Sequence, residues 1–115
     1  MTELLHIADR ASWATAARAG EYLMSTRGVT LEQQGFIHCS LRYQLRAVAE
    51  AIYSDSDDLV VLVIDSARVP SPVRYEAPDG ETESYPHIYG PLPADAVVDV
   101  ITVSWDEAGR LVLPR

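Results

Sequence analysis

The stretch DLVVLVID, residues 58–65, decides the fold class of this chain. Its aliphatic run, Leu59–Ile64, is rich in β-branched residues and contains no polar residue. A run that is apolar at every position, and not at every second one, is typical of a central strand buried on both faces of its sheet. The run is also far too short to span a bilayer. We therefore expect a sheet with this segment at its centre.

Shorter strand candidates follow this segment and make the second half of the chain a sheet region. They are VRYE (residues 73–76), HIYG (87–90), AVVDVITVSW (96–105) and RLVLP (110–114). The last two are separated by DEAG, a hairpin signal in which Gly109 is free to adopt a positive φ. The segment APDGETES (77–84) is expected to be a solvated loop, with a loop that covers a substrate as the alternative.

Helices are expected in the first half of the chain, between short strands. LLHIA (residues 4–8) is predicted to be a strand, EYLMS (21–25) another, and WATAARA (13–19) a helix. Asp9 or Ser12 is available to cap that helix, and Gly20 is suited to the left-handed conformation past its end. Further on, Thr30 and Gln33 have the spacing of a capping box, which predicts a single helical turn before Gly35.

The second main helix is expected just after FIHCS (residues 36–40), a short strand whose last residue, Ser40, is placed to cap it. The apolar residues that recur at the spacing of one helical face are Leu41, Leu45, Val48 and Ile52. With helices confined to the first half and strands concentrated in the second, the pattern indicates an α+β fold and not a wound parallel sheet.

Composition limits the chain to one domain and narrows its partners. A length of 115 residues with 48% hydrophobic content is enough for one core and too little for two, so residues 1–115 are expected to form a single domain. The formal net charge of −8 would repel a polyanion, which argues against nonspecific nucleic-acid binding. All nine basic residues are arginines, and the absence of lysine excludes Schiff-base chemistry.

The chain is expected to act in the cytoplasm and away from membranes. Its first residues, MTELLHIADR, carry an early acid and lack the basic start and long apolar stretch of a signal peptide. The single cysteine, Cys39, has no partner for an internal disulfide or a Cys-based zinc site, which fits a reducing compartment. We expect Cys39 to be a small buried hydrophobe. The sequence leaves the oligomeric state open.

The three histidines of the chain occur in similar settings. His6 lies in LLHIAD, His38 in GFIHCS and His87 in YPHIYGPL. A single histidine on a strand is usually a core or edge residue whose ring bonds a backbone carbonyl. Here every histidine lies on a strand-like segment and none on the solvated face of a helix, so we expect the three imidazoles to converge on one pocket.

Four segments carry a resemblance to a known family. In chain order they are LLHIADRASWATAARAGEY (residues 4–22), GFIHCS (35–40), DLVVLVID (58–65) and YPHIYGPLPADAVVDV (85–100). Together they resemble a small bacterial family, domain-of-unknown-function family 952, whose known structures have an ADP-ribosyltransferase-like fold. The resemblance implies a split β-sandwich with two main helices in the N-terminal half. It also implies a cleft for NAD or an ADP-ribose-like ligand, and a glycosyltransferase or other NAD-processing activity.

The same resemblance implies catalytic roles for all three histidines. His6 matches the first-strand residue that hydrogen-bonds a ribose hydroxyl of NAD. His38 matches the second-motif residue, which makes another ribose or phosphate contact, with Ser40 nearby as a second polar group. His87 matches the third-motif position, where a glutamate is common. We expect His87 to titrate near neutral pH as the acid or base.

Two further residues are predicted to contact the nucleotide. Arg42 lies in the first turn of the expected second helix, whose N-terminus attracts anions, and is predicted to meet a pyrophosphate. Tyr89 is a candidate for stacking on a base or on nicotinamide.

Departures from the transferase pattern leave a second class of function open. Ile7 and Ala8 stand where the histidine-bearing branches have glycine and then serine or threonine. His87 supplies no fixed negative charge for an oxocarbenium-like state. Glu81 or Glu83 in the loop could supply an anion, although neither occupies the motif position. The alternative is therefore a non-catalytic ligand-binding module.

A three-histidine metal site is the remaining rival. Three imidazoles can hold zinc and leave a fourth position open for water. No two of the histidines have the close spacing that often builds such a site, and no carboxylate is adjacent. Metal therefore ranks below nucleotide, and no metal is expected.

Overall fold

The sheet at the centre of the molecule has three antiparallel strands in the order β1-β6-β10. The computed structural model describes residues 2–113. The three strands are β1 (Glu3–Asp9), β6 (Leu59–Asp65) and β10 (Val97–Thr102). The first six residues of β6 are buried, which confirms the prediction of a central strand covered on both faces.

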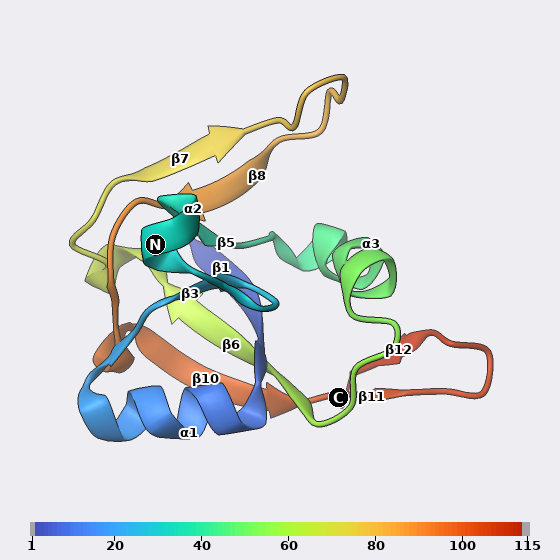
Figure 1. The fold of residues 1–115 in the computed structure, drawn as a ribbon. Helices are drawn as coiled ribbons and strands as arrows, with labels where there is room; N and C mark the ends of the chain where they lie inside the picture. The colour runs from blue at the N-terminus through green and yellow to red at the C-terminus, as the bar shows by residue number, and fades with distance from the viewer. Residues whose placement is uncertain (1, 114–115) are drawn as a thin grey trace.

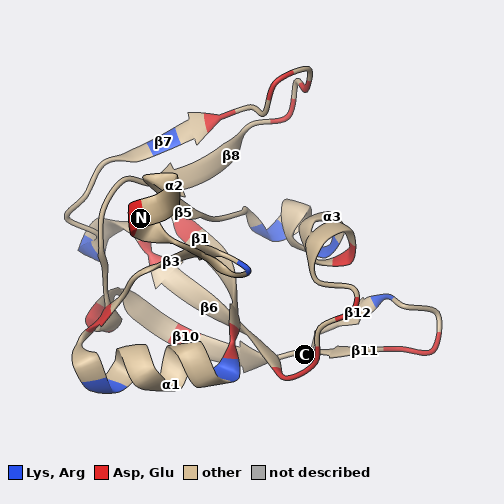
Figure 2. Cartoon of the chain, in the orientation of Figure 1, with Lys and Arg blue, Asp and Glu red and all other residues tan. Residues whose placement is uncertain are grey.

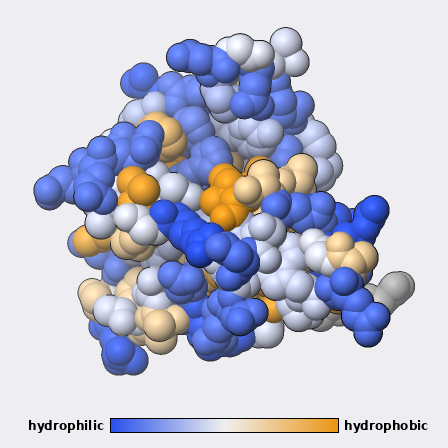
Figure 3. Space-filling view, turned by 45° about the vertical axis from the view of Figure 1, so that its right-hand side comes forward, coloured by the Kyte–Doolittle hydropathy of each residue, from blue (hydrophilic) through white to orange (hydrophobic). Residues whose placement is uncertain are grey.

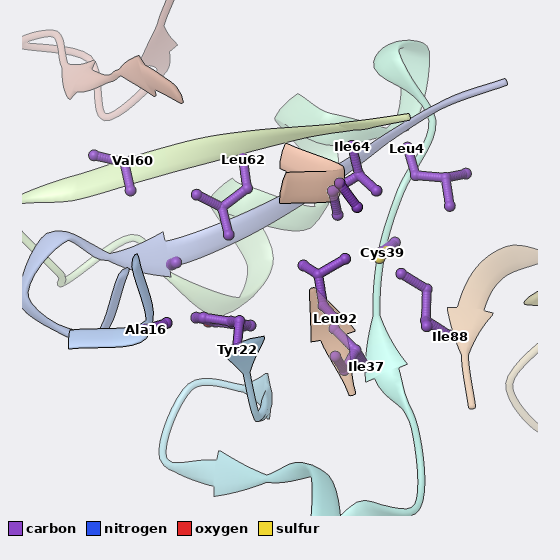
Figure 4. Packing of buried hydrophobic residues seen from close by; sticks show 12 residues of the cluster. Leu4, Ala16, Tyr22, Ile37, Cys39, Val60, Leu62, Ile64, Ile88 and Leu92 are labelled. Atoms are coloured by element: carbon purple, nitrogen blue, oxygen red, sulfur yellow. The ribbon is translucent and has the colours of Figure 1, made fainter. Parts of the chain in front are cut away.

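Apolar side chains of this sheet point to its two faces in alternation and pack into two separate cores. On one face, Leu4, Leu62 and Ile64 pack with Tyr22, Ile37, Ile88 and Leu92, as Figure 4 shows. On the other face, the buried partners of helix α3 (Arg42–Ile52) are Leu5, Ile7, Val61 and Val63. Two cores explain why the sequence of β6 is apolar at every position.

A second antiparallel sheet carries two of the three histidines. Its strands, in the order β5-β8-β7, are β5 (Ile37–His38), β8 (Tyr85–Ile88) and β7 (Val73–Glu76). In Figure 1, β7 and β8 lie above the central sheet. The two sheets are joined where Leu5 and Ser40 exchange backbone hydrogen bonds of 2.8 Å each. This junction fixes β5 beside β1.

Residues 2–113 contain three α-helices, and their ends follow the sequence signals closely. Helix α1 (Arg10–Ala19) ends at Gly20, whose φ is 95°. Helix α2 (Leu31–Gln34) starts with the expected capping box, in which Thr30 Oγ1 accepts from the Gln33 backbone N–H and Gln33 Oε1 accepts from the Thr30 N–H. In Figure 1, α1 and α3 lie at different sides of the sheets.

The remaining elements are short. They are β2 (Glu21–Tyr22), paired with β9 (Leu92–Pro93); β3 (Met24–Thr26), paired with β4 (Val29–Thr30); β11 (Ser104–Trp105), paired with β12 (Leu111–Val112); and the 3-10 turns η1 (Ser66–Arg68) and η2 (Ala94–Ala96). The expected hairpin is present, with φ of 78° at Gly109. The α+β class is confirmed.

Four expectations about elements need correction. The stretch EYLMS forms two strands, β2 and β3, and the strand expected at 87–90 begins at Tyr85 and ends at Ile88. The expected strand at 96–105 is interrupted at residue 103, and the end of the one at 110–114 lies outside the described residues. Ser40 does not cap α3, because its backbone is paired with Leu5. Leu41 is the N-cap residue, and its N–H donates to Gln44 Oε1 at 2.9 Å.

The surface is mostly hydrophilic in the face drawn in Figure 3, with small apolar patches between polar side chains. Acidic residues concentrate at two hairpin tips, the loop between β7 and β8 and the turn between β11 and β12 (Figure 2). Cys39 is only 2% exposed and packs in the core of Figure 4, as expected for a small hydrophobe.

Candidate functional site

A pocket of about 310 Å³ opens beside the second sheet. Polar and apolar groups line it: Ser25, Thr26, Gln34, Phe36, His38, Ile52, Ala77, Pro78 and His87. These residues come from β3, α2, β5 and the segment just before it, the end of α3, the start of the loop after β7, and β8. A larger hollow of about 500 Å³ beside β3 and α2 has, from the described part of the chain, Glu32 as its one ionisable lining residue. The histidine-lined pocket therefore offers more for chemistry.

His38 and His87 lie side by side in this pocket wall. They are Cα partners in the pairing of β5 with β8, so strand register alone brings the two side chains to the same face of the sheet. His38 Nδ1 lies 3.2 Å from His87 Nε2, and the ring centroids are 5.1 Å apart. The two imidazoles are thus joined by a hydrogen bond.

Glu76 completes a chain of polar groups behind His87. Its Oε1 lies 2.7 Å from His87 Nδ1 and also accepts a hydrogen bond from the Tyr89 hydroxyl. The hydrogen bond from Tyr89, followed by that from His87, holds the pKa of the Glu76 carboxyl below its ordinary value. The site therefore contains a carboxylate, a fixed negative charge, next to His87.

The sequence analysis did not identify Glu76, although the strand VRYE was predicted. Its contact with His87 depends on the register of β7 against β8, in which Glu76 faces Tyr85 and Arg74 faces His87. An eight-residue loop (residues 77–84) separates the two strands, and a loop of that length does not fix a register from sequence, as a two-residue turn would.

His6 lies behind His38 and not in the pocket wall. Its ring is 2% exposed, with Nδ1 at 2.6 Å from the His38 carbonyl oxygen and Nε2 at 2.9 Å from the Tyr22 hydroxyl. Because a carbonyl only accepts, Nδ1 carries the proton and Nε2 accepts from Tyr22. Burial is the main cause that lowers the pKa of His6, to about 4. His6 lines only a cavity of about 10 Å³ that it shares with His38.

The expectation that His6 would contact a ribose directly is therefore corrected. Both of its ring nitrogens already have protein partners, and its side chain is sealed from solvent. The structure brings His38 and His87 together and assigns His6 to the support of the His38 backbone. Burial of a polar ring beside a strand carbonyl was the simpler reading of a lone histidine, and it holds for this one.

The other three predicted contact residues lie apart from the pocket wall. Ser40 is 2% exposed and borders the small cavity next to His6. Arg42 forms a bidentate pair with Glu3, with both Nε and Nη2 at 3.0 Å from the carboxylate oxygens, on the surface. Tyr89 uses its hydroxyl on Glu76, and the Arg74 guanidinium lies 5.1 Å from its ring centroid. Arg42 therefore lies outside the pocket wall, paired with Glu3.

The loop after β7 takes part in the pocket, which the sequence favoured only as the alternative. Its first two residues, Ala77 and Pro78, line the pocket together with His38 and His87. Glu83 lies elsewhere, with one carboxylate oxygen at 2.7 Å from the Tyr43 hydroxyl and 2.6 Å from Gln44 Nε2. Neither Glu81 nor Glu83 lines the pocket.

Ser25 is a lining residue that sequence reasoning missed. Its side chain is fully buried, and its Oγ has no hydrogen-bond partner among residues 2–113. A buried hydroxyl without a partner is costly, typically by about 1–3 kcal/mol. No sequence signal distinguishes this serine from others, because the lack of a partner is a property of the assembled fold.

The geometry does not assemble the ligand set of a metal. Within the described part of the chain, no group of three or more histidine, cysteine, aspartate or glutamate side chains has the arrangement to hold a metal ion. His6 would have to give up its bond with Tyr22 to offer Nε2. The three histidines are therefore linked through hydrogen bonds and not by convergence on one point.

Comparison with known proteins identifies the family. The family model DUF952, described as "Protein of unknown function", matches residues 7–100. The chain belongs to this family. The DUF952 chain is similar to the crystal structure of protein CC0527 from Caulobacter crescentus, at 26% identity and a TM-score of 0.83, covering 96% of this chain and 94% of that one. The solution NMR structure of CC0527 is also similar, at 26% identity and a TM-score of 0.77, covering 96% and 91%.

No curated protein matches this DUF952 chain. The match in structure extends over almost the whole length of both chains, so it covers both sheets. Across residues 2–113, no helix is long and apolar enough to cross a membrane.

Proposed function

We propose that this DUF952 chain binds an NAD- or ADP-ribose-like ligand in the pocket lined by His38 and His87, and that these two imidazoles process it. The proposal rests on one observation above all. A largely apolar pocket of about 310 Å³ has two hydrogen-bonded imidazoles and an unpartnered buried hydroxyl in its wall. Small-molecule sites have this character, apolar with a few convergent polar groups, and start at about 300 Å³.

The family resemblance supports the choice of ligand. The resemblance implies an ADP-ribosyltransferase-like split β-sandwich with a cleft for NAD, and the pairing of β5 with β8 would form one wall of that cleft. Fold resemblance alone does not assign an activity, so the chemistry of the pocket has to carry the rest. We also assign this function to the cytoplasm, on the free and buried Cys39.

Charge selects the part of the ligand that enters the pocket. No arginine of residues 2–113 lines it, and Arg42, the cation expected at a pyrophosphate, is paired with Glu3. A phosphate inside would therefore lack a cationic partner. The apolar wall with Phe36 suits a flat ring, and the hydroxyl and imidazole groups suit ribose hydroxyls. The nicotinamide and ribose part of NAD fits this pattern, with its phosphates outside the pocket.

We expect His38→Ala to weaken NAD binding by about 1–3 kcal/mol, which is roughly 5- to 150-fold in Kd. The physical reason is that a ligand hydroxyl loses its partner inside a pocket with little water. Isothermal titration calorimetry with NAD and with nicotinamide riboside measures the effect. Arg42→Ala is the matched control and should leave both affinities unchanged, because its guanidinium pairs with Glu3 on the surface. Wild-type protein that binds neither compound would end the proposal.

Ser25→Ala should have opposite effects on stability and on binding. Removing an unpartnered buried hydroxyl is expected to raise the free energy of unfolding of the ligand-free protein by about 1 kcal/mol. The same change should weaken NAD binding about tenfold, because the ligand would supply the missing partner. Urea unfolding and calorimetry measure the two quantities. The exposed Ser104 gives a control, Ser104→Ala, that should change neither. A loss of stability without loss of affinity would show that Ser25 has only a structural role.

Turnover separates an enzyme from a binding module. Release of nicotinamide from NAD by the wild type, absent from a His38→Ala sample, would establish processing. NAD binding without release would assign the chain to the non-catalytic class that Ile7 and Ala8 favour. Sensitivity of the release to a chelator would favour the metal rival.

A further inference from the structure

With both imidazoles neutral, the contacts of Glu76, His87 and His38 fix where their protons lie. An ionised carboxylate only accepts hydrogen bonds, so the 2.7 Å contact with Glu76 Oε1 requires a proton on His87 Nδ1. Neutral His87 then has a lone pair on Nε2. The 3.2 Å contact between that atom and His38 Nδ1 requires the proton to be on His38 Nδ1. The lone pair of neutral His38 is therefore on Nε2.

The free lone pair is at the pocket. Along residues 2–113, His38 Nε2 has no hydrogen-bond partner, and it is not among the buried unpaired atoms. Both ring nitrogens of His6 and both of His87 are engaged by protein groups. Of the six imidazole nitrogens in the chain, His38 Nε2 is thus the one available to a ligand.

We propose that Glu76, His87 and His38 form a proton relay whose outer end, His38 Nε2, is the general base of the pocket and acts on a hydroxyl group of the ligand. The identity of that ligand rests on the proposed function, but the relay itself does not. Glu76 acts through His87 and is a positioning residue, and His38 is the group that touches the ligand.

The relay transfers one proton from the ligand to His87 and leaves His38 neutral, with a negative charge on the ligand oxygen and a positive charge on His87. The ligand hydroxyl gives its proton to His38 Nε2 and keeps the electron pair of the O–H bond. His38 gives the proton on Nδ1 to His87 Nε2. His38 is then again neutral, and His87 is an imidazolium beside the Glu76 carboxylate. The reverse transfer returns the proton to a leaving oxygen, so the same groups serve as base and then as acid.

The surroundings of the two rings favour a neutral His38 and a positive charge on His87. Burial, and next the neighbouring His87, lower the pKa of His38, so this base is unprotonated at neutral pH. Phe36 stacks on His87 with centroids 4.0 Å apart and a 14° interplanar angle, which covers one face of the ring that receives the charge.

Among residues 2–113, the other titratable and charged groups around the relay are compatible with these charges. Tyr89 donates to Glu76, and the Arg74 guanidinium, 5.1 Å from the Tyr89 ring centroid, helps to lower the pKa of Glu76. Tyr85 faces His38 with centroids 5.8 Å apart, and the buried Cys39 thiol, whose pKa is raised by burial, stays neutral. His6 is neutral and donates to the His38 carbonyl.

Two measurements on ligand-free protein test the relay. Nitrogen-15 NMR of the imidazoles should find the proton on Nδ1 of both His38 and His87. In a reaction with diethyl pyrocarbonate, read by peptide mass spectrometry, His38 should be modified at least about tenfold faster than His6 or His87, because a nitrogen that holds a protein partner cannot attack.

Glu76→Gln removes the charge and keeps an acceptor for His87 Nδ1. We expect the imidazole titrations to move to lower pH and the modification of His38 to slow severalfold. Tyr89→Phe is the matched control, because it removes the hydroxyl that donates to the same carboxylate oxygen and leaves the charge of Glu76 unchanged. This variant should keep the wild-type rate of modification to within about twofold. A proton on Nε2 of His87, or a Glu76→Gln protein that reacts and titrates like wild type, would overturn the relay. Failure of NAD binding alone would remove the proposed ligand and leave the relay standing.

Discussion

His6→Ala is expected to lower the free energy of unfolding by about 3–5 kcal/mol, the largest single effect that the site predicts. The change leaves two polar groups, the His38 carbonyl and the Tyr22 hydroxyl, without their partner, and each loss typically costs about 1–3 kcal/mol. The cavity left by the ring adds to that cost. Urea unfolding followed by circular dichroism measures the difference from wild type.

Tyr22→Phe is the matched control for this result. It removes the hydroxyl that donates to His6 Nε2 and keeps the ring that packs in the first core, so a smaller loss, about 1–2 kcal/mol, is expected. NAD affinity should be measured at a temperature where both variants are folded. A His6→Ala protein as stable as wild type but with lost affinity would restore His6 as a direct ligand contact.

The free energy of unfolding should fall by about 3 kcal/mol between pH 6.5 and pH 4, because of His6. Its pKa is lowered from 6.5 to about 4 in the folded protein, and each tenfold change in proton affinity corresponds to about 1.4 kcal/mol. Within this window the unfolded chain binds a proton that the folded chain excludes, so stability is complete above pH 6.5 and is lost as the pH falls. Unfolding titrations at half-unit intervals of pH measure the slope.

His6→Asn is the variant that isolates this slope. Its amide N–H can donate to the His38 carbonyl, but it has no proton to gain. The variant should lose most of the pH dependence between 4 and 6.5 and keep the part caused by His38, whose pKa is also lowered by burial. The carboxyl of Glu76, with a lowered pKa, acts in the same direction at still lower pH. An unchanged slope in His6→Asn would mean that His6 does not carry the effect.

The fold was largely predictable because its main signals are local or periodic. The aliphatic run of β6 identified the central strand, since a sheet with a core on each face requires apolar residues at every position. The pattern of Thr30 and Gln33 identified α2 through contacts within one turn. The start of α3 was misplaced because Ser40 makes a backbone pair with Leu5, a residue 35 positions away, which no local pattern encodes.

The site was predictable only in part, for a related reason. Family resemblance and strand position brought attention to His38 and His87, which share one pocket wall. The exclusion of His6 depends on Tyr22, and the role of Glu76 depends on strand register across a long loop. The missing partner of Ser25 is visible only once every neighbour is in position. The positions of His6, Glu76 and Ser25 each depend on contacts between residues far apart in the chain. A single sequence gives too little information about such contacts.

The junction at which Leu5 and Ser40 pair has a consequence for hydrogen exchange around the pocket. Together with the bond from His6 to the His38 carbonyl, it makes β5 part of the same cooperative unit as the central sheet, so its amides should open only with global unfolding. Ala77 and Pro78, by contrast, belong to an exposed loop outside that unit. The pocket is therefore lined on its sheet side by residues that should exchange their amide hydrogens only with global unfolding, and on its loop side by residues whose amides should exchange much sooner.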